Sequence, residues 1–249
     1  MNKKIYFSPS ENFKFISIAQ SMELLCEDSH WIENNMPLFD LLEIRKPDIV
    51  VLADDFYSTE HIQYAKQEYP NVKFVLCGKN NDPVFDLFID LDQTPYLANR
   101  VFSGGKHSDA YETDILFISD NFSMQNNVEE HIKILFSACK DYRLKIYGVN
   151  NVKVPNYLGM LPANEYKNAI ASAKIVMMFD HQWLNTVLLN KRIPLVFNAK
   201  ENTDVVFSSY THLKTILDKH LNKKEITYID YKENVETYDI VCNKILEIA

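Results

Sequence analysis

Eight short apolar runs recur along this chain of 249 residues, and a segment with the polarity pattern of a helix follows nearly every one. Continuous apolar runs of this length are typical of strands that helices cover on both faces, as in a parallel sheet. The apolar runs lie at 3–7, 48–53, 72–77, 85–90, 114–119, 144–148, 174–179 and 193–197. The helical patterns lie at 12–26, 37–45, 59–68, 125–140, 163–172, 183–190, 209–221 and 233–248. The alternation predicts βαβ units and an α/β fold.

The pattern begins twice. Residues 101–113 form an irregular polar stretch with two glycines, after which ETDILFISDN repeats the strand, polar loop and helix order of the amino terminus. We expect two Rossmann-like domains with parallel sheets and a cleft between them, at 1–105 and 106–249. A single large sheet with a long surface loop at 102–112 is the alternative.

The totals exclude several classes of protein. A net charge of −8 provides no overall positive field for nucleic acid, although a local basic groove stays open. The four cysteines lie far apart without a CxxC pair, which favours reduced thiols inside a cell over a zinc site. The start, MNKKIYFSPSENF, has only three apolar residues between its lysines and a polar loop, which is too short a run for a signal peptide, and no window approaches 18 apolar residues. We expect a cytoplasmic protein without a membrane span, in the host cytoplasm if a phage encodes it.

Polar loops follow the strands that open each half. They read SPSENFK at 8–14 and SDNFSM at 119–124, and Ser119 and Asn121 in the second are candidate phosphate contacts. Neither loop contains GxGxxG or GxxxxGK[ST], so ordinary dinucleotide and ATP sites are disfavoured. The alternative is that these serines and asparagines only cap the next helix.

The strand at 144–148 ends in Gly148, where the missing Cβ allows a ligand to approach the backbone. Lys145 and Tyr147 precede this tip, and Lys145 faces either a phosphate or, as an edge residue, the solvent. Gly159 and Pro162 then bracket a turn. We expect a nucleobase along this turn, read by the backbone groups of Met160 or Leu161.

A polar loop joins the two most apolar strands and leads into a helix. Its candidate ligand contacts are Asp180, His181, Gln182, Asn185 and Thr186. They surround a strand end and a helix start, where backbone N–H groups attract a diphosphate. The alternative is that Asp180 only caps the helix and Trp183 only packs beneath it.

The order of these motifs resembles a known family. I-Y-G at 146–148, G-x-x-P-x-x-E-Y at 159–166 and P-L-V at 194–196, with the helices and polar loop between them, are similar to the donor-binding half of GT-B glycosyltransferases. The similarity is to the retaining group-1 type and its spore-maturation relatives. It implies a nucleotide diphosphate sugar as donor, expected to be a UDP-sugar, an acceptor on the other half, no permanently bound cofactor and no metal ion.

Two departures from the family pattern matter. The family commonly has a glutamate that holds the ribose at the start of the second helix, where this chain has Asn185 and Thr186. The family also has a glycine just before the following strand, and this chain has Asn190, Lys191 and Arg192 at that place. Either Asn185 or Thr186 contacts the ribose, or the activity is lost and the chain is a nucleotide-sugar sensor. The short chain resembles compact phage and mobile-element transferases.

An inverting transfer needs a base for the acceptor proton. The candidates are Asp54 and Asp55, after the strand at 48–53, and Glu11 in the first loop, with His107 as a further residue that can face the cleft. Adjacent acids at a strand end are also a common solvated cap. Asp90-Leu91-Asp92 has the letters of a metal motif without its apolar setting.

The sequence does not decide whether the acceptor is a saccharide, a lipid-linked sugar or a hydroxymethylated base in phage DNA. For DNA modification, the lysines near the acceptor mouth would be Lys3, Lys4, Lys14 and Lys106, and the enzyme would have to extract its target nucleotide from the stack. The oligomeric state is open. A third class, a receiver-like or flavodoxin-like signalling domain with its acids at 54–55, leaves the second half of the chain unexplained.

Overall fold

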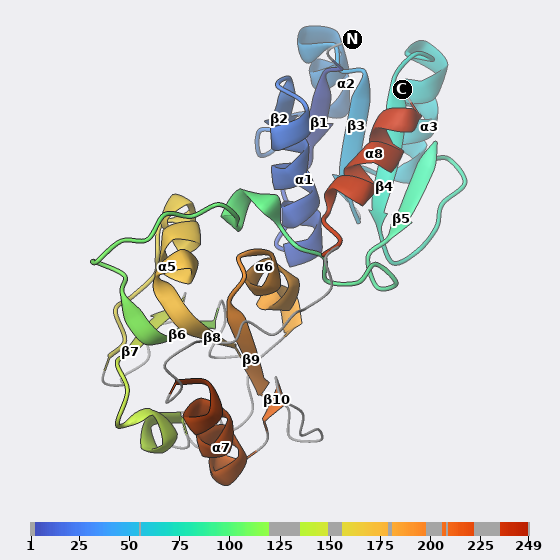
Figure 1. The fold of residues 1–249 in the computed structure, drawn as a ribbon. Coiled ribbons are helices and arrows are strands. Elements are labelled where there is room, and N and C mark those ends of the chain that lie inside the picture. The colour runs from blue at the N-terminus through green and yellow to red at the C-terminus, as the bar shows by residue number, and fades with distance from the viewer. Residues whose placement is uncertain are drawn as a thin grey trace. The chain divides into compact units, whose positions relative to one another are not determined.

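The structure is a computed structural model that describes residues 3–54, 56–119, 135–148, 156–178, 181–197, 206–207, 209–221 and 235–248. The chain divides into two compact units (Figure 1). The first comprises Met1–Val101 with Glu236–Ala249, and the second comprises Phe102–Val235.

The first unit contains a five-stranded parallel sheet with the order β2-β1-β3-β4-β5. Its strands are β1 Ile5–Phe7, β2 Ser29–Trp31, β3 Ile49–Ala53, β4 Lys73–Gly78 and β5 Leu87–Asp90. Its helices are α1 Phe13–Leu25, α2 Leu38–Asp40 with a π-helical turn at Leu41–Arg45, α3 Thr59–Glu68 and α8 Asp239–Glu247. Side chains of β3 alternate between two cores: Ile49 and Val51 pack with α1 and α8, whereas Val50 and Leu52 pack on the face that carries α2 and α3.

The carboxyl-terminal helix α8 belongs to the first unit (Figure 1). Cys242 and Ile245 of this helix and Tyr238 at its N-cap are completely buried, and the Cys242 thiol donates to the Ile18 carbonyl oxygen of α1 at 3.3 Å. The expected boundary assigned 106–249 to the second unit. The structure differs for residues 236–249, because the apolar stripe of α8 covers α1.

The second unit contains a five-stranded parallel sheet with the order β10-β9-β8-β6-β7. Its strands are β6 Thr113–Ser119, β7 Leu144–Gly148, β8 Ala173–Met178, β9 Ile193–Phe197 and β10 Val206–Phe207. Its helices are α5 Tyr166–Ser172, α6 Leu184–Leu189 and α7 Tyr210–Leu221, with short 3₁₀ turns at Ala163–Glu165 and His181–Trp183. Residues 135–139 are helical, and the earlier part of the helix expected at 125–140 lies outside the described residues.

Both sheets have the same topology when each is numbered from its own first strand, 2-1-3-4-5. This is a doubly wound order, in which ligands bind beyond the carboxyl ends of the strands at the point where the strand order reverses. That point lies between β1 and β3 in the first sheet and between β6 and β8 in the second. The expectation of two Rossmann-like units is confirmed, and a single continuous sheet is excluded.

All eight expected strands occur, together with two short ones, β2 and β10, that the sequence did not predict. The four cysteines are free and buried, as expected for structural thiols. Within the described parts of the chain, every helix is too short or too polar to cross a membrane.

Candidate functional site

The carboxyl end of β7 is extended by a second segment of chain. Residues 156–159 run beside it: the Ile146 N–H donates to the Asn156 carbonyl oxygen at 3.0 Å, and the Gly148 N–H donates to the Gly159 carbonyl oxygen at 3.1 Å. The Tyr157 hydroxyl donates to the Gly148 carbonyl oxygen at 2.9 Å and closes this pairing. The sequence did not single out Tyr157, although its position before the G-x-x-P turn was a usable signal. The turn is therefore fixed to the end of the sheet.

Gly159 has a φ of +92°, a conformation that L side chains rarely adopt. After it the Met160 side chain is 65% exposed and Leu161 is buried. Among the described residues, no hydrogen bond joins the backbone of Met160 or Leu161 to another group. That these N–H and C=O groups bond to the edge of a planar heterocycle stays a prediction from the sequence.

The segment after β8 places only some of the predicted side chains at the surface. Gln182 and Asn185 are half-buried, whereas Thr186 is completely buried. Thr186 and Val187 face the interior together, so the Thr186 side chain cannot contact a ligand. Helix α6 has only six residues, so its dipole contributes little to anion binding.

Trp183 is a core residue. Its ring stacks on Tyr166 with the centroids 5.3 Å apart and also contacts Phe102, with the centroids 4.9 Å apart. The side chain is 3% exposed. This is the packing role that the sequence left open for Trp183, and it anchors the start of α6.

Four predicted contacts lie at or beyond the edge of what the structure describes. Ser119 is the last residue of β6, opposite Gly148 in the ladder, but its side chain is not described. The backbone of His181 begins the 3₁₀ turn, and its side chain is likewise not described. Asn121 and Asp180 lie outside the described residues. The backbone thus brings Ser119, Gly148 and the segment after β8 to one edge of the sheet.

Lys145 lies elsewhere. It pairs with Leu116, three residues before the end of β6, which is about 10 Å along the strand. Its ammonium donates to the Ala110 carbonyl oxygen at 2.6 Å, before β6 begins. The structure therefore contradicts a phosphate contact for Lys145, because the side chain reaches toward the amino edge of the sheet.

Tyr147 packs inside the second unit and is buried. Its ring lies 6.4 Å from that of Tyr111, centroid to centroid. Burial is the main cause that raises the pKa of Tyr147, and the electrostatic effect of Tyr111 is the second. A ligand therefore meets the backbone at the end of β7 more readily than the Tyr147 phenol.

In the first unit, Asp54 follows β3 and its carboxylate accepts from the Lys79 backbone N–H, with both oxygens at 3.2 Å. Asp54 lines a pocket of about 340 Å³ at the carboxyl ends of β3 and β4. The other lining residues are Leu52, Ala53, Tyr57, Thr59, Leu76, Lys79, Asn80, Asn81, Asp82 and Phe85. Apolar and polar side chains both line this pocket, as they do in small-molecule sites.

The loop after β1 lies at the same edge of the first sheet. Glu11 is exposed there, before Asn12, whose side chain caps α1 by accepting from the Lys14 and Phe15 N–H groups. The prediction that polar residues of this loop cap the next helix is thus confirmed for Asn12. Ser8 at the start of the loop is completely buried and accepts from the Ala53 N–H at 2.8 Å, so it links the ends of β1 and β3. Asp55 lies outside the described residues.

Two acidic groupings resemble metal sites. Asp90 accepts from the Asp92 N–H at 2.9 Å and caps its own turn. His107, Asp109 and Glu112 bring one ligand atom each within 4.8 Å of the others. Asp109 is exposed. The pKa of Glu112 is lowered, first by the hydrogen bond that Arg143 donates to it and then by the positive charge of Arg143. We assign no metal to either grouping.

Comparisons place this geometry among solved structures. No family model matches the chain, and no curated protein matches it. The UDP-GlcNAc 2-epimerase of Methanocaldococcus jannaschii is 10% identical, with a TM-score of 0.54, and the match covers 99% of this chain and 100% of that one. S. aureus MnaA, solved with UDP, is 10% identical, with a TM-score of 0.52 and coverage of 91% and 90%. The spinosyn forosaminyltransferase SpnP is 8% identical, with a TM-score of 0.50 and coverage of 100% and 96%. At such identities the similarity shows the fold, which is of the GT-B type.

Proposed function

We propose that this chain binds a UDP-sugar at the carboxyl edge of its second sheet and transfers the sugar to an acceptor hydroxyl. The observation that carries the proposal is the pairing of Gly148 with Gly159, which leaves the Met160 and Leu161 backbone unbonded beside the end of β7. The GT-B-type fold supports it, since proteins with this fold include a sugar transferase and a protein solved with UDP.

In the proposed complex, uracil lies along the turn at 158–161 and bonds to the backbone of Met160 and Leu161. Gly148 has no side chain to obstruct the ribose. The diphosphate lies over the ends of β6 and β8, where the strand order reverses, with Gln182 and Asn185 as hydrogen-bond donors. In the reaction, such donors stabilise the charge on the departing UDP.

Asp54 is the proposed general base for the acceptor hydroxyl, and Glu11 is the second candidate. A carboxylate that accepts the proton as the bond to the sugar forms contributes typically 10²- to 10⁴-fold to such a rate. Asp54 lines a pocket whose rim includes Thr59, Asn80 and Asn81. These hydroxyl and amide groups suit the hydroxyls of a saccharide acceptor.

We propose a saccharide in preference to a DNA base as acceptor. Of the lysines expected at a DNA-binding mouth, Lys3 and Lys4 precede β1, at the amino edge of the first sheet. The Lys14 ammonium donates to the Leu91 carbonyl oxygen at 2.6 Å and lies over the Tyr96 ring. The positions of these lysines therefore do not favour a basic acceptor groove.

Two other functions use the same site. Epimerisation of a UDP-sugar is favoured by the match to an epimerase over almost the full length of both chains. A nucleotide-sugar sensor without catalysis is favoured by Asn185 and Thr186 in place of a glutamate. Both retain the UDP site and differ in what happens to the sugar.

The test begins with calorimetric titration of the full chain with UDP, GDP and ADP, for which we expect selective binding of UDP. Incubation with UDP-glucose and UDP-N-acetylglucosamine, with and without a panel of saccharides, then separates the functions. Transfer or slow donor hydrolysis supports the transferase, an epimeric UDP-sugar the epimerase, and binding without turnover the sensor. Absence of UDP binding at millimolar concentration would remove all three.

A further inference from the structure

The last strand of the first sheet, β5, has an open edge. The sheet order ends at β5, and among the described residues no segment pairs with its outer side. The outer strand β7 of the second sheet differs, because residues 156–159 cover its edge. In β5, Leu87, Phe88 and Ile89 are apolar and only Asp90 is charged. An apolar edge strand with unpaired backbone groups is a template for a further strand.

The backbone groups of Leu87 and Ile89 point to this open edge. The Asp86 N–H donates to the Phe74 carbonyl oxygen at 2.8 Å, so residue 86 bonds toward β4. Successive residues of a strand direct their N–H and C=O groups to opposite sides, and Leu87 and Ile89 therefore direct theirs away from β4. Within the described chain no other segment bonds to them. Both residues thus have a free donor and a free acceptor at the edge.

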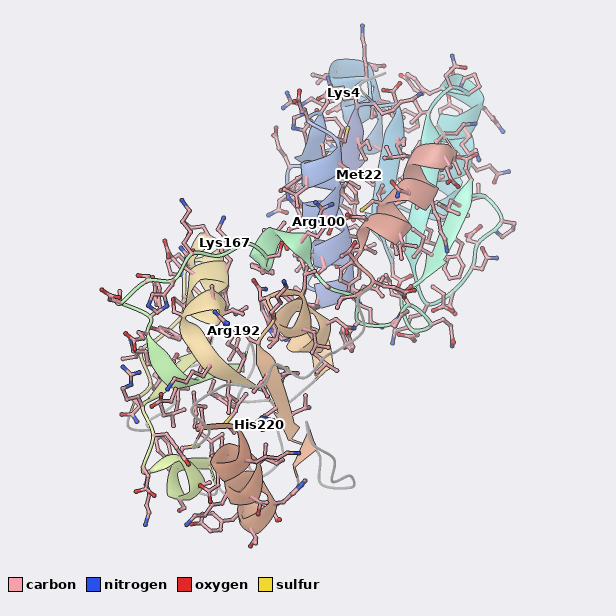
Figure 2. The ribbon with its side chains drawn as sticks, in the orientation of Figure 1. Lys4, Met22, Arg100, Lys167, Arg192 and His220 are labelled. Atoms are coloured by element: carbon pink, nitrogen blue, oxygen red, sulfur yellow. The ribbon has the colours of Figure 1, made fainter. Side chains whose placement is uncertain are left out.

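A pocket of about 460 Å³ lies along the same edge, between β5 and the helix α8. Leu87 and Ile89 line it from the strand, and Ile240 lines it from the helix with 43% of its surface exposed. The Arg100 guanidinium contacts Asp239 in the first turn of α8 at 2.6 Å, next to Ile240 (Figure 2). Exposed apolar side chains gathered at one place mark interaction surfaces. Here they adjoin a strand that can accept a partner.

The charges along this surface are self-complementary. Glu236, Ile240 and Lys244 line the pocket at intervals of four residues, and all three are exposed. Neither Glu236 nor Lys244 has an ion pair with a described residue. Asp90, the other charged residue of the lining, accepts from two backbone N–H groups of its own turn. An acid and a base therefore lie on either side of an exposed isoleucine, in an order that a twofold axis would match to itself.

We infer that this surface is the interface of a homodimer, in which β5 of two copies pairs antiparallel and joins their first sheets. The twofold axis passes between the two copies of Phe88, so Leu87 of each copy exchanges backbone hydrogen bonds with Ile89 of the partner subunit. On the side of α8 the two Ile240 side chains approach each other, and Glu236 lies beside Lys244 of the partner subunit. Twofold contacts use the same patch on both copies and must be self-complementary.

The order of charges favours a second copy over an unrelated peptide as the occupant. A peptide that adds to a strand edge needs apolar side chains and free backbone groups, and it requires no symmetry in the surface that receives it. Glu236 and Lys244 on either side of Ile240 provide that symmetry. The proposed UDP site lies in the second unit, so the dimer does not depend on it.

Two opposite charge reversals give the sharpest test. In Glu236→Lys a base would face Lys244 of the partner subunit, and in Lys244→Glu an acid would face Glu236 of the partner subunit. We expect each variant alone to dimerise roughly tenfold more weakly than the wild type. In an equimolar mixture the two variants complement each other at both contacts, so a mixed dimer should recover the wild-type affinity. A contact within one copy cannot produce this recovery.

Sedimentation velocity of the full chain, over a range of concentrations at low ionic strength, measures the dimerisation. Glu60→Lys makes the same charge change at an exposed site of α3 and should leave the affinity unchanged. Ile240→Asp places two carboxylates near the axis and should weaken the dimer by roughly tenfold or more. Circular dichroism of each variant shows whether its fold is intact, and the mixture repeats that control because it uses the same two samples.

Three outcomes would overturn the inference. One is a wild type that stays monomeric at hundreds of micromolar. Another is a dimer whose affinity none of the three α8-side variants changes, since its interface would then lie elsewhere. The third is a mixture of Glu236→Lys and Lys244→Glu that associates no better than either variant alone. UDP titration of the same samples reports separately on the proposed function, whose failure would leave the dimer unaffected.

Discussion

The carboxylate of Asp54 occupies the space that a side chain at Gly78 would fill. A Cβ built on Gly78 would lie 1.6 Å from Asp54 Oδ1. The glycine at the end of β4 thus allows the carboxylate to lie against the sheet edge and accept from the Lys79 N–H. This contact orients Asp54 at the rim of its pocket, and it is compatible with either a cap or a base.

Asp54→Asn separates these roles. The amide oxygen still accepts from the Lys79 N–H, so we expect thermal stability and UDP affinity to stay close to wild type. As a base the amide is ineffective, and turnover should fall by roughly 100-fold or more. Steady-state kinetics with the donor found in the panel measures this, with Asp109→Asn, at an exposed site of the second unit, as the control. Wild-type turnover in Asp54→Asn would leave Asp54 as a cap only.

Gly159→Ala tests the nucleobase turn. Nothing lies within 4 Å of a Cβ at this position, so the cost comes from the positive φ alone and should be about 1 kcal/mol. Gly104 also has a positive φ and open space around it, which makes Gly104→Ala a matched control. We expect similar small losses of stability in urea but weaker UDP binding only in Gly159→Ala. Equal UDP affinities in the two variants would contradict the placement of uracil on this turn.

Asn185→Ala tests the diphosphate contact, and Lys145→Ala serves as its control. Asn185 is half-buried after β8, whereas the Lys145 ammonium bonds to Ala110 toward the amino edge. We expect UDP affinity to fall about fivefold to tenfold in Asn185→Ala and to stay unchanged in Lys145→Ala, by calorimetry. Uridine, which lacks the diphosphate, should bind both variants alike. A loss in Lys145→Ala instead would contradict the proposed orientation of the nucleotide.

Sequence patterns were sufficient for the central strands of both sheets. Runs such as Ile49–Ala53 are apolar at every position because both faces are covered, and this signal does not depend on the rest of the fold. The strand β2 lacked this apolar signal because Ser29–Trp31 is a polar edge strand. Its register with β1 is set by the fold. β10 has only two residues.

The sequence was weaker for the site, because a side chain's type does not fix the direction it takes. Alternation placed Lys145 on one face of β7 but did not show that its ammonium would reach back to Ala110. Thr186 has the chemistry of a ribose contact, yet packing turns it inward beside Val187. The pattern at 233–248 predicted a helix, whereas the packing of α8 on α1 became clear only in the fold.

The buried thiols of Cys139 and Cys242 predict sensitivity to alkali. Burial raises the pKa of each to about 12, whereas an unfolded cysteine has a pKa near 8.5. The unfolded state therefore loses these protons first, so the stability they contribute is complete below about pH 8.5 and is lost as pH rises toward 12. At pH 9.5 we expect a loss of roughly 1 kcal/mol for each thiol, measured by urea unfolding. The double variant Cys139→Ala, Cys242→Ala should show a shallower pH dependence, and an equal slope would contradict the prediction.

Ile245→Ala tests the assignment of α8 to the first unit. Ile245 is completely buried in the core that α8 forms with α1, so the change should cost about 2–5 kcal/mol. Ile240→Ala on the same helix removes a side chain that is 43% exposed and should cost much less. Hydrogen exchange read by mass spectrometry should show faster exchange of β3 in Ile245→Ala, with β8 unchanged. If β8 lost its protection and β3 kept it, residues 236–249 would belong with the second unit instead.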